Sequence, residues 1–127
     1  MDRILLVFLG AGLGGVGRYV LATSVETWWA TQLGGFRIGT FAVNLIGSLV
    51  IGIAAGAWSD HHIVKYFVIT GLLGGFTTFS SFSRDTVELV AAGKPGIALS
   101  YVLASVVMCV VAAWLGIGLG RQLAPVG

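Results

Sequence analysis

A dense group of hydroxyl and phenylalanine side chains follows two adjacent glycines in the third apolar stretch of this chain. Five hydroxyl residues stand within the seven positions from Thr77 to Ser83, and Phe79 and Phe82 alternate with them. Hydroxyls donate single hydrogen bonds without adding charge, and the electron-poor edge of an aromatic ring can face an anion. The combination suits a small anion that passes in single file. The simpler alternative is a Phe pair packed on a neighbouring helix, with the hydroxyls bonded to their own carbonyls.

The spacing of these residues sorts them onto faces if the segment is helical. Phe79 and Phe82 then share one side, next to a polar stripe. That stripe consists of Thr78, Ser81, Asp85 and Glu88. Because Gly74 and Gly75 carry no Cβ, we expect the helix to break at these two glycines. A break within a membrane needs protein or water to satisfy the freed backbone groups, and this arrangement is typical of ion sites.

The composition places the chain in a membrane. Of its 127 residues, 9% are charged and 57% are hydrophobic, and the mean hydropathy is +0.98. Soluble proteins carry about 25% charged residues, so this chain cannot cover a water-facing surface. The net charge of +2 is too small to indicate nucleic acid binding. Cys109 is the single cysteine, so it forms no intrachain disulfide, and we expect an inert core residue.

Four apolar segments are long enough to cross a membrane as helices. We place them at about residues 4–25, 38–58, 66–90 and 97–120 of one domain that covers residues 1–127. Small residues recur at every fourth position in three of these segments, which favours close helix contact. These stripes contain Gly10 and Gly14, then Gly52 and Gly56, and finally Ala112, Gly116 and Gly120. The predicted fold is an all-α integral membrane protein with four transmembrane helices, the third broken at mid-membrane.

Polar side chains inside these segments each need a partner. Arg18 shares the small-residue stripe of the first segment, so its guanidinium either faces the protein interior or extends to the interface. The amide of Asn44 either joins two helices or donates into a pathway. Tyr101 and Ser105 in the fourth segment have the same two alternatives.

The remaining ionisable residues indicate neither an enzyme nor a metal site. Asp85 or Glu88 is expected to pair with Arg84 close to the water interface. His61 and His62 are adjacent, so their side chains diverge on a helix, and a solvated loop is favoured over a metal site. The sequence contains no Ser-His-Asp arrangement, P-loop or dinucleotide fingerprint in a suitable context.

The distribution of Lys and Arg gives little bias to the orientation of the chain. Four spans place both termini on one side, with three cations there against two on the other. The first group is Arg3, Lys65 and Arg121, and the second is Arg37 and Lys94. Counting the span-embedded Arg18 and Arg84 makes the ratio three against four. Since the positive-inside rule needs a clear excess, we expect insertion in both orientations, which an antiparallel homodimer requires.

Taken together, these residues resemble the Fluc/CrcB family of fluoride channels. The resemblance covers nearly the whole chain, including its length and four-span layout, and its most specific part runs from Gly71 to Ser83. Further matches are Gly17-Arg18-Tyr19 in the first span, Gly39, Thr40, Asn44 and Gly47 in the second, and Tyr101 and Ser105 in the fourth. The chain differs from the usual family pattern at three places. Ser81 stands where Thr is usual, Asp85 stands where Glu is usual, and Cys109 lies near a position that is often Ser.

The resemblance implies a fluoride-selective channel of the cell membrane that exports fluoride passively and protects against its toxicity. Two subunits would pack in antiparallel orientation within the lipid bilayer and form two fluoride pathways. The pathways would be lined by Asn44, Phe79 and Phe82, with Thr40, Ser81, Tyr101 and Ser105 as donors and Arg18 near a vestibule. The carbonyls of Gly74 and Thr77 from both subunits would hold a sodium ion at the dimer centre.

Two other functions are weaker alternatives. Fluoride is strongly hydrated, so a pathway must replace its water with many close donors, which the hydroxyl pattern supplies. A small dual-topology multidrug exporter has a similar size but needs a carboxylate in mid-membrane, and Glu26 lies at the end of its span. A non-transporting assembly subunit would use the small-residue stripes, yet it leaves the Phe and hydroxyl pattern without a purpose.

Overall fold

Three long apolar helices form most of the structure, a computed structural model that describes residues 2–29 and 34–124. They are α1 (Arg3–Trp29), α2 (Ile38–Trp58) and α5 (Pro95–Leu123). Each is long and apolar enough to cross a membrane, since about 20 apolar residues span the hydrocarbon core. The described ranges contain no strand. The chain is therefore an all-helical integral membrane protein, as its composition predicts.

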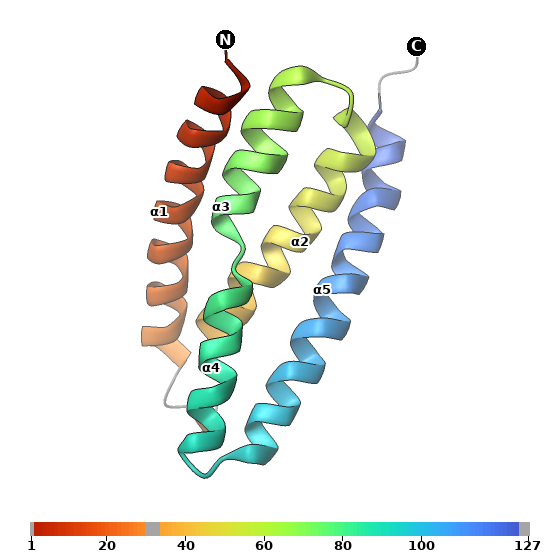
Figure 1. The fold of residues 1–127 in the computed structure, drawn as a ribbon. Helices are drawn as coiled ribbons and strands as arrows, with labels where there is room; N and C mark the ends of the chain where they lie inside the picture. The colour runs from red at the N-terminus through yellow and green to blue at the C-terminus, as the bar shows by residue number, and fades with distance from the viewer. Residues whose placement is uncertain (1, 30–33, 125–127) are drawn as a thin grey trace.

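Between α2 and α5 the chain forms an interrupted helix. A π-helical segment, η1 (Val64–Leu73), passes directly into the short α3 (Gly74–Phe76). After two residues in extended conformation, α4 (Phe79–Ala91) continues toward the opposite end of the bundle. Figure 1 shows this gap as the narrow link between the segments labelled α3 and α4. The third apolar segment is thus divided into two halves that point the same way.

Small residues bring the helices together in two pairs. In Figure 1, α1 lies along η1 and α3, while α2 lies along α5, and the start of α1 and the end of α5 are at the same end of the bundle. A Cβ on Gly14 would collide with the Leu72 carbonyl, and a Cβ on Gly116 would collide with the Leu49 carbonyl. The predicted small-residue stripes therefore serve contacts within one chain.

The helix ends depend on a few specific residues. Gly93 closes the turn between α4 and α5 with a φ of 73°, a left-handed conformation that glycine adopts without strain. Pro95 begins α5, where its missing N–H costs no helix hydrogen bond. The Gly39 N–H donates to Glu26 Oε2 at 2.8 Å. This bond joins the end of α1 to the start of α2.

The helices extend beyond three of the four predicted spans. The first helix continues to Trp29 instead of ending near residue 25, and α5 covers residues 95–123 rather than 97–120. The third segment begins at Val64, two residues early, whereas α2 has the predicted bounds. A helix can continue past the apolar core because it satisfies its own backbone groups, and Trp side chains suit the interface.

A small core holds α4 against α5. It consists of Phe82, Leu89, Ala98 and Tyr101. Elsewhere the outer faces of α1 and α5 expose large apolar side chains such as Phe8, which suits contact with lipid. The core fixes the position of α4, which carries most of the candidate site.

Candidate functional site

The helix break is an extended link of two threonines. The φ and ψ angles are −79° and 155° at Thr77, and −150° and 114° at Thr78. The Ser81 N–H donates to Thr78 Oγ1 at 3.1 Å. Thr78 is therefore the N-cap of α4, and its side chain satisfies one of the amides left free at a helix start.

The amide of Asn44 spans the break from α2. Its nitrogen donates to the Thr78 carbonyl at 3.0 Å, and its Oδ1 accepts from the Thr78 N–H at 2.8 Å. Both backbone groups of Thr78 thus find partners, although the residue is only 7% exposed. Of the two alternatives for Asn44, joining helices is the one seen here. The amide nitrogen keeps a second hydrogen, and Asn44 also lines a cavity.

The break lies at Thr77 and Thr78 rather than at the predicted Gly74 and Gly75. Both glycines are helical. A Cβ on Gly75 would meet the Ala11 backbone, so this glycine permits close packing on α1. The position of the break follows from partners: helical geometry can be lost at Thr78 because Asn44 accepts and donates there.

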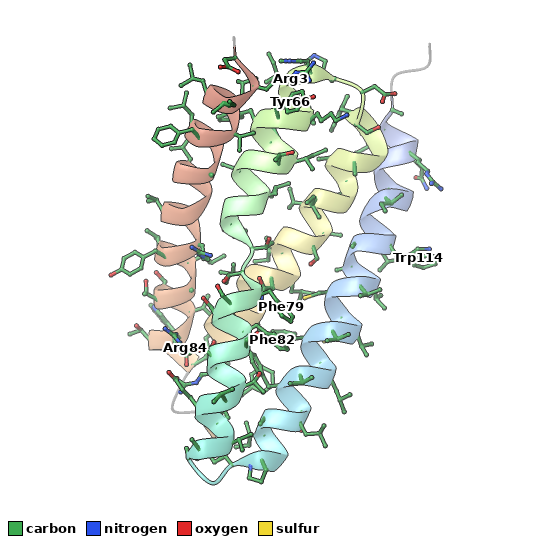
Figure 2. All side chains as sticks on the ribbon, in the orientation of Figure 1. Arg3, Tyr66, Phe79, Phe82, Arg84 and Trp114 are labelled. Carbon is green, nitrogen blue, oxygen red and sulfur yellow. The ribbon has the colours of Figure 1, made fainter. Side chains whose placement is uncertain are left out.

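Phe79 and Phe82 form the pair that their spacing predicts. Their ring centroids are 5.4 Å apart with an interplanar angle of 40°. Phe82 also packs on Tyr101 at 5.3 Å. Phe82 is 9% exposed, whereas Phe79 is 78% exposed. Figure 2 shows both rings on the side of α4 that faces α5.

These rings border a cavity of about 360 Å³, here called the phenylalanine cavity. Asn44, Thr77 and Ser105 are among its other lining residues. The Ser105 hydroxyl is buried and has no hydrogen-bond partner among the described residues. Cys109 also lines this cavity and is only half-buried, so it lies at the edge of the core rather than inside it, and its inertness stays a prediction. Aromatic, amide and hydroxyl groups from α2, α4 and α5 therefore meet at one place.

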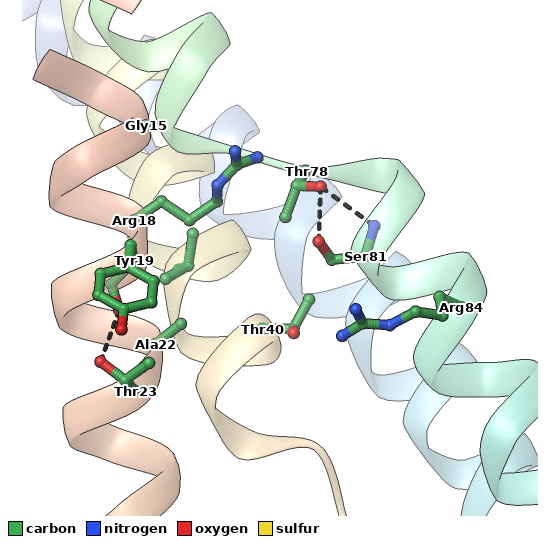
Figure 3. A pocket seen from close by; sticks show the side chains of 10 residues that line it. Gly15, Arg18, Tyr19, Ala22, Thr23, Thr40, Thr78, Ser81 and Arg84 are labelled. Atoms are coloured by element: carbon green, nitrogen blue, oxygen red, sulfur yellow. Dashed lines mark hydrogen bonds between the residues drawn. The ribbon is translucent and has the colours of Figure 1, made fainter. Parts of the chain in front are cut away.

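A second cavity of about 270 Å³, the arginine cavity, lies on the other side of α4. Arg18, Thr40, Ser81 and Arg84 line it, and Thr78 lines both cavities. Figure 3 shows the side chains of Arg18 and Arg84 extending into the space between α1 and α4. Most of the predicted site residues thus line one of two cavities that share Thr78, whereas Gly74 and Tyr101 line neither.

Asp85, which the sequence predicts to lie close to the water interface, is a buried carboxylate that contacts residues of two other helices. It is 3% exposed. Its Oδ2 accepts from the Thr40 hydroxyl at 2.6 Å and lies 3.5 Å from the Tyr101 hydroxyl. Tyr101 is fully buried and lines neither cavity. The carboxylate is buried because residues from α2 and α5 cover it, which no local pattern in α4 indicates.

Ion pairs surround the same end of α4. Arg84 lies 3.3 Å from Asp85 and 3.5 Å from Glu88, and Arg37 lies 3.1 Å from Glu88. The predicted pairing of Arg84 with these carboxylates is confirmed. The multidrug-exporter alternative needs an unpaired carboxylate that a cationic drug can reach. Asp85 does not match this description, because it is buried and paired with Arg84.

Comparisons with known proteins point to one family. The CrcB-like protein family (Camphor Resistance, CrcB) matches residues 5–117. A Coxiella burnetii protein named fluoride-specific ion channel FluC is 42% identical over 95% of this chain and 99% of its own length. Proteins of the same name from Agrobacterium fabrum and Magnetococcus marinus are each 41% identical. The first covers 97% of this chain and 99% of its own length, and the second 94% and 98%.

Proposed function

The chain belongs to the CrcB-like protein family, and from this premise we infer that it is a fluoride-specific ion channel and not an enzyme. It is a multi-pass integral membrane protein of the cell membrane. The observation that carries this function is the phenylalanine cavity beside a helix break. Polarised ring edges and neutral donors replace water around fluoride without the strong hold of a full charge.

The proposed fluoride pathway follows α4 through the phenylalanine cavity. Phe79 and Phe82 offer ring edges, Asn44 offers its second amide hydrogen, and Ser105 offers a hydroxyl without a protein partner. Fluoride is small, so donors from three helices can converge on it more closely than on chloride. Size and donor number therefore account for the selectivity.

The other predicted donors belong to the polar side of α4 in this proposal. Ser81 and Arg18 line the arginine cavity, where Arg18 gathers anions. Thr40 and Tyr101 contribute through Asp85, because both hydroxyls face that carboxylate. Their role is then to hold the acidic side chain at the end of the pathway.

We also propose that η1, α3 and α4 together make the fourth membrane crossing and that two chains assemble as an antiparallel homodimer. The support is the exposure of residues at the break. Gly74 and most of Phe79 lie on the outside of the single chain, where a second copy would cover them. The weak Lys/Arg bias permits both orientations.

A sodium site at the centre of this dimer fits the backbone of the break. In a continuous helix the Gly74 carbonyl would accept from the Thr78 N–H, and the Thr77 carbonyl from the Ser81 N–H. These donors instead bond Asn44 Oδ1 and Thr78 Oγ1. Two carbonyls are thus left for a hard cation, which prefers oxygen ligands and binds at unwound helix segments.

The test of function is ion efflux from liposomes that contain the purified protein. With valinomycin to carry compensating potassium, we expect rapid fluoride efflux and retention of chloride under the same gradient. Equal efflux of the two anions would refute fluoride selectivity, and proton-coupled uptake of a cationic drug without fluoride efflux would instead indicate the exporter.

The sodium site has a separate test. Thr77→Ser keeps the backbone carbonyl, whereas Gly74→Val places a branched side chain at an exposed position of the proposed interface. We expect sodium to stabilise the purified parent and Thr77→Ser against thermal unfolding relative to N-methylglucamine, and Gly74→Val to lose this effect. The same response in all three proteins would contradict a site at these carbonyls.

A further inference from the structure

Cationic and aromatic side chains surround Tyr66 at the end of the bundle where α1 begins. The guanidinium carbon of Arg3 lies 5.0 Å from the centre of the Tyr66 ring, and the ammonium nitrogen of Lys65 lies 5.9 Å from it. The His62 ring packs on the same side chain, with the ring centroids 4.9 Å apart. Figure 2 shows Arg3 and Tyr66 together at this end. Attraction between the cations and the ring therefore joins α1 to η1.

Arg3 and Lys65 make no ion pair with the described residues. Every ion pair within the described ranges involves Arg37 or Arg84 instead. The Asp2 carboxylate, next to Arg3 in the chain, accepts a backbone N–H of α1 at 3.1 Å. Two like charges thus lie close to one ring, and their separation cannot exceed the sum of the two distances to its centre. An external anion between them would relieve their repulsion.

This cluster lies at the end of a membrane-crossing helix. The residues that follow Arg3 in α1 are apolar, and the helix is long enough to span a membrane. Ile4 and Phe8, in its first two turns, are exposed. Tyr side chains favour the membrane interface, and Arg and Lys near helix ends extend their charges toward the lipid headgroups. An exposed apolar surface that suits acyl chains therefore lies directly beside the two cations.

The ligand whose chemistry matches this surface is an acidic phospholipid. Its phosphate supplies negative charge and accepts hydrogen bonds, and the guanidinium of Arg3 and the ammonium of Lys65 have five and three N–H donors. A zwitterionic lipid has the same phosphate, but its headgroup also carries a cation that these two side chains repel. A soluble phosphate compound lacks acyl chains to cover the exposed apolar turns of α1. Charge and apolar surface together thus favour the acidic lipid.

We propose that Arg3, Lys65 and Tyr66 form a binding site for the headgroup of one acidic phospholipid. Its acyl chains lie along Ile4 and Phe8 at the start of α1. The bound lipid holds α1 against η1, because each of these helices supplies one of the two cations. In the proposed antiparallel homodimer, the two copies of the site face opposite leaflets. Lipid binding at this surface does not rest on the proposed channel function.

The experiment counts lipids bound to the purified full chain in detergent by native mass spectrometry, as dioleoyl phosphatidylglycerol or dioleoyl phosphatidylcholine is added. We expect tighter binding of phosphatidylglycerol, and Arg3→Gln and Lys65→Gln should each weaken it about fivefold. Arg3→Lys keeps the charge and should bind like the parent. Arg121→Gln is the matched control, because it removes one charge at the same end of the bundle from α5, which does not contact α1. It should also bind like the parent.

Several results would overturn the site. Equal binding of the two lipids by the parent, or unchanged phosphatidylglycerol binding by Arg3→Gln, would show that these cations do not select an acidic headgroup. An equal loss in Arg121→Gln would indicate general attraction to this end of the bundle instead of a site at Tyr66. Displacement of phosphatidylglycerol by an equal concentration of glycerol phosphate would indicate a soluble ligand. Arg3 and Lys65 are exposed, so their variants are expected to fold, which the unfolding temperature in detergent checks.

Discussion

Replacing Asn44 by alanine removes both hydrogen bonds that hold the helix break. The Thr78 N–H and carbonyl then lose partners at 2.8 and 3.0 Å. If water from the adjoining cavities replaced the amide, the free energy of unfolding would fall by about 1 kcal/mol, because each of the two interhelical bonds contributes about 0.6 kcal/mol in a membrane. If no water reaches the Thr78 N–H and carbonyl, each of these unpaired groups lowers the free energy of unfolding by about 1–3 kcal/mol. Because Thr78 is nearly buried, we expect a total loss of about 2–6 kcal/mol.

The loss can be measured by reversible unfolding of the purified protein in mixed micelles, with increasing sodium dodecyl sulfate and tryptophan fluorescence as the signal. The four Trp residues of the chain report the transition. Ser48→Ala is the matched control. Ser48 lies one turn from Asn44 on α2 and lines the same cavity, but it makes no hydrogen bond to the break among the described residues. It should cost less than about 0.5 kcal/mol.

A loss below about 1 kcal/mol in Asn44→Ala would refute the reasoning, because water would then satisfy Thr78. The Asn44 amide would not be needed to hold the extended link. A loss in the expected range, together with an unchanged Ser48→Ala, would establish that the break depends on a side chain from another helix.

Phe79→Ile and Phe82→Ile keep apolar bulk but remove the polarised ring edges, so fluoride efflux from liposomes should fall at least about tenfold while the protein remains folded. Normal efflux in both variants would return the pair to ordinary packing. Gly14→Val should prevent folding because its side chain would overlap the Leu72 carbonyl, whereas Gly12→Val should be tolerated because that position is open. Equal yields of folded protein from both variants would contradict the packing of α1 on η1. C-terminal tags should be accessible on both sides of the membrane in comparable amounts, and a single orientation of the active protein would exclude the antiparallel dimer.

The sequence alone determined the features that depend on composition and local spacing. Few charges and long apolar segments identify a membrane protein, because a water-facing surface cannot be built from them. Phe79 and Phe82 are three residues apart, so any helix places them on one side, and their contact was predictable. The small-residue stripes likewise indicated close helix contact, although not which helices would meet.

Tertiary structure decided which partners each polar group finds. The break lies at Thr78 rather than at the glycines, because Asn44 on α2 satisfies the freed backbone groups. Asp85 is buried inside the chain, because Thr40 on α2 and Tyr101 on α5 cover it. Local periodicity relates a residue only to neighbours within a few turns. Hydrogen-bond partners 16 to 45 residues away along the chain become known only when the helices are packed.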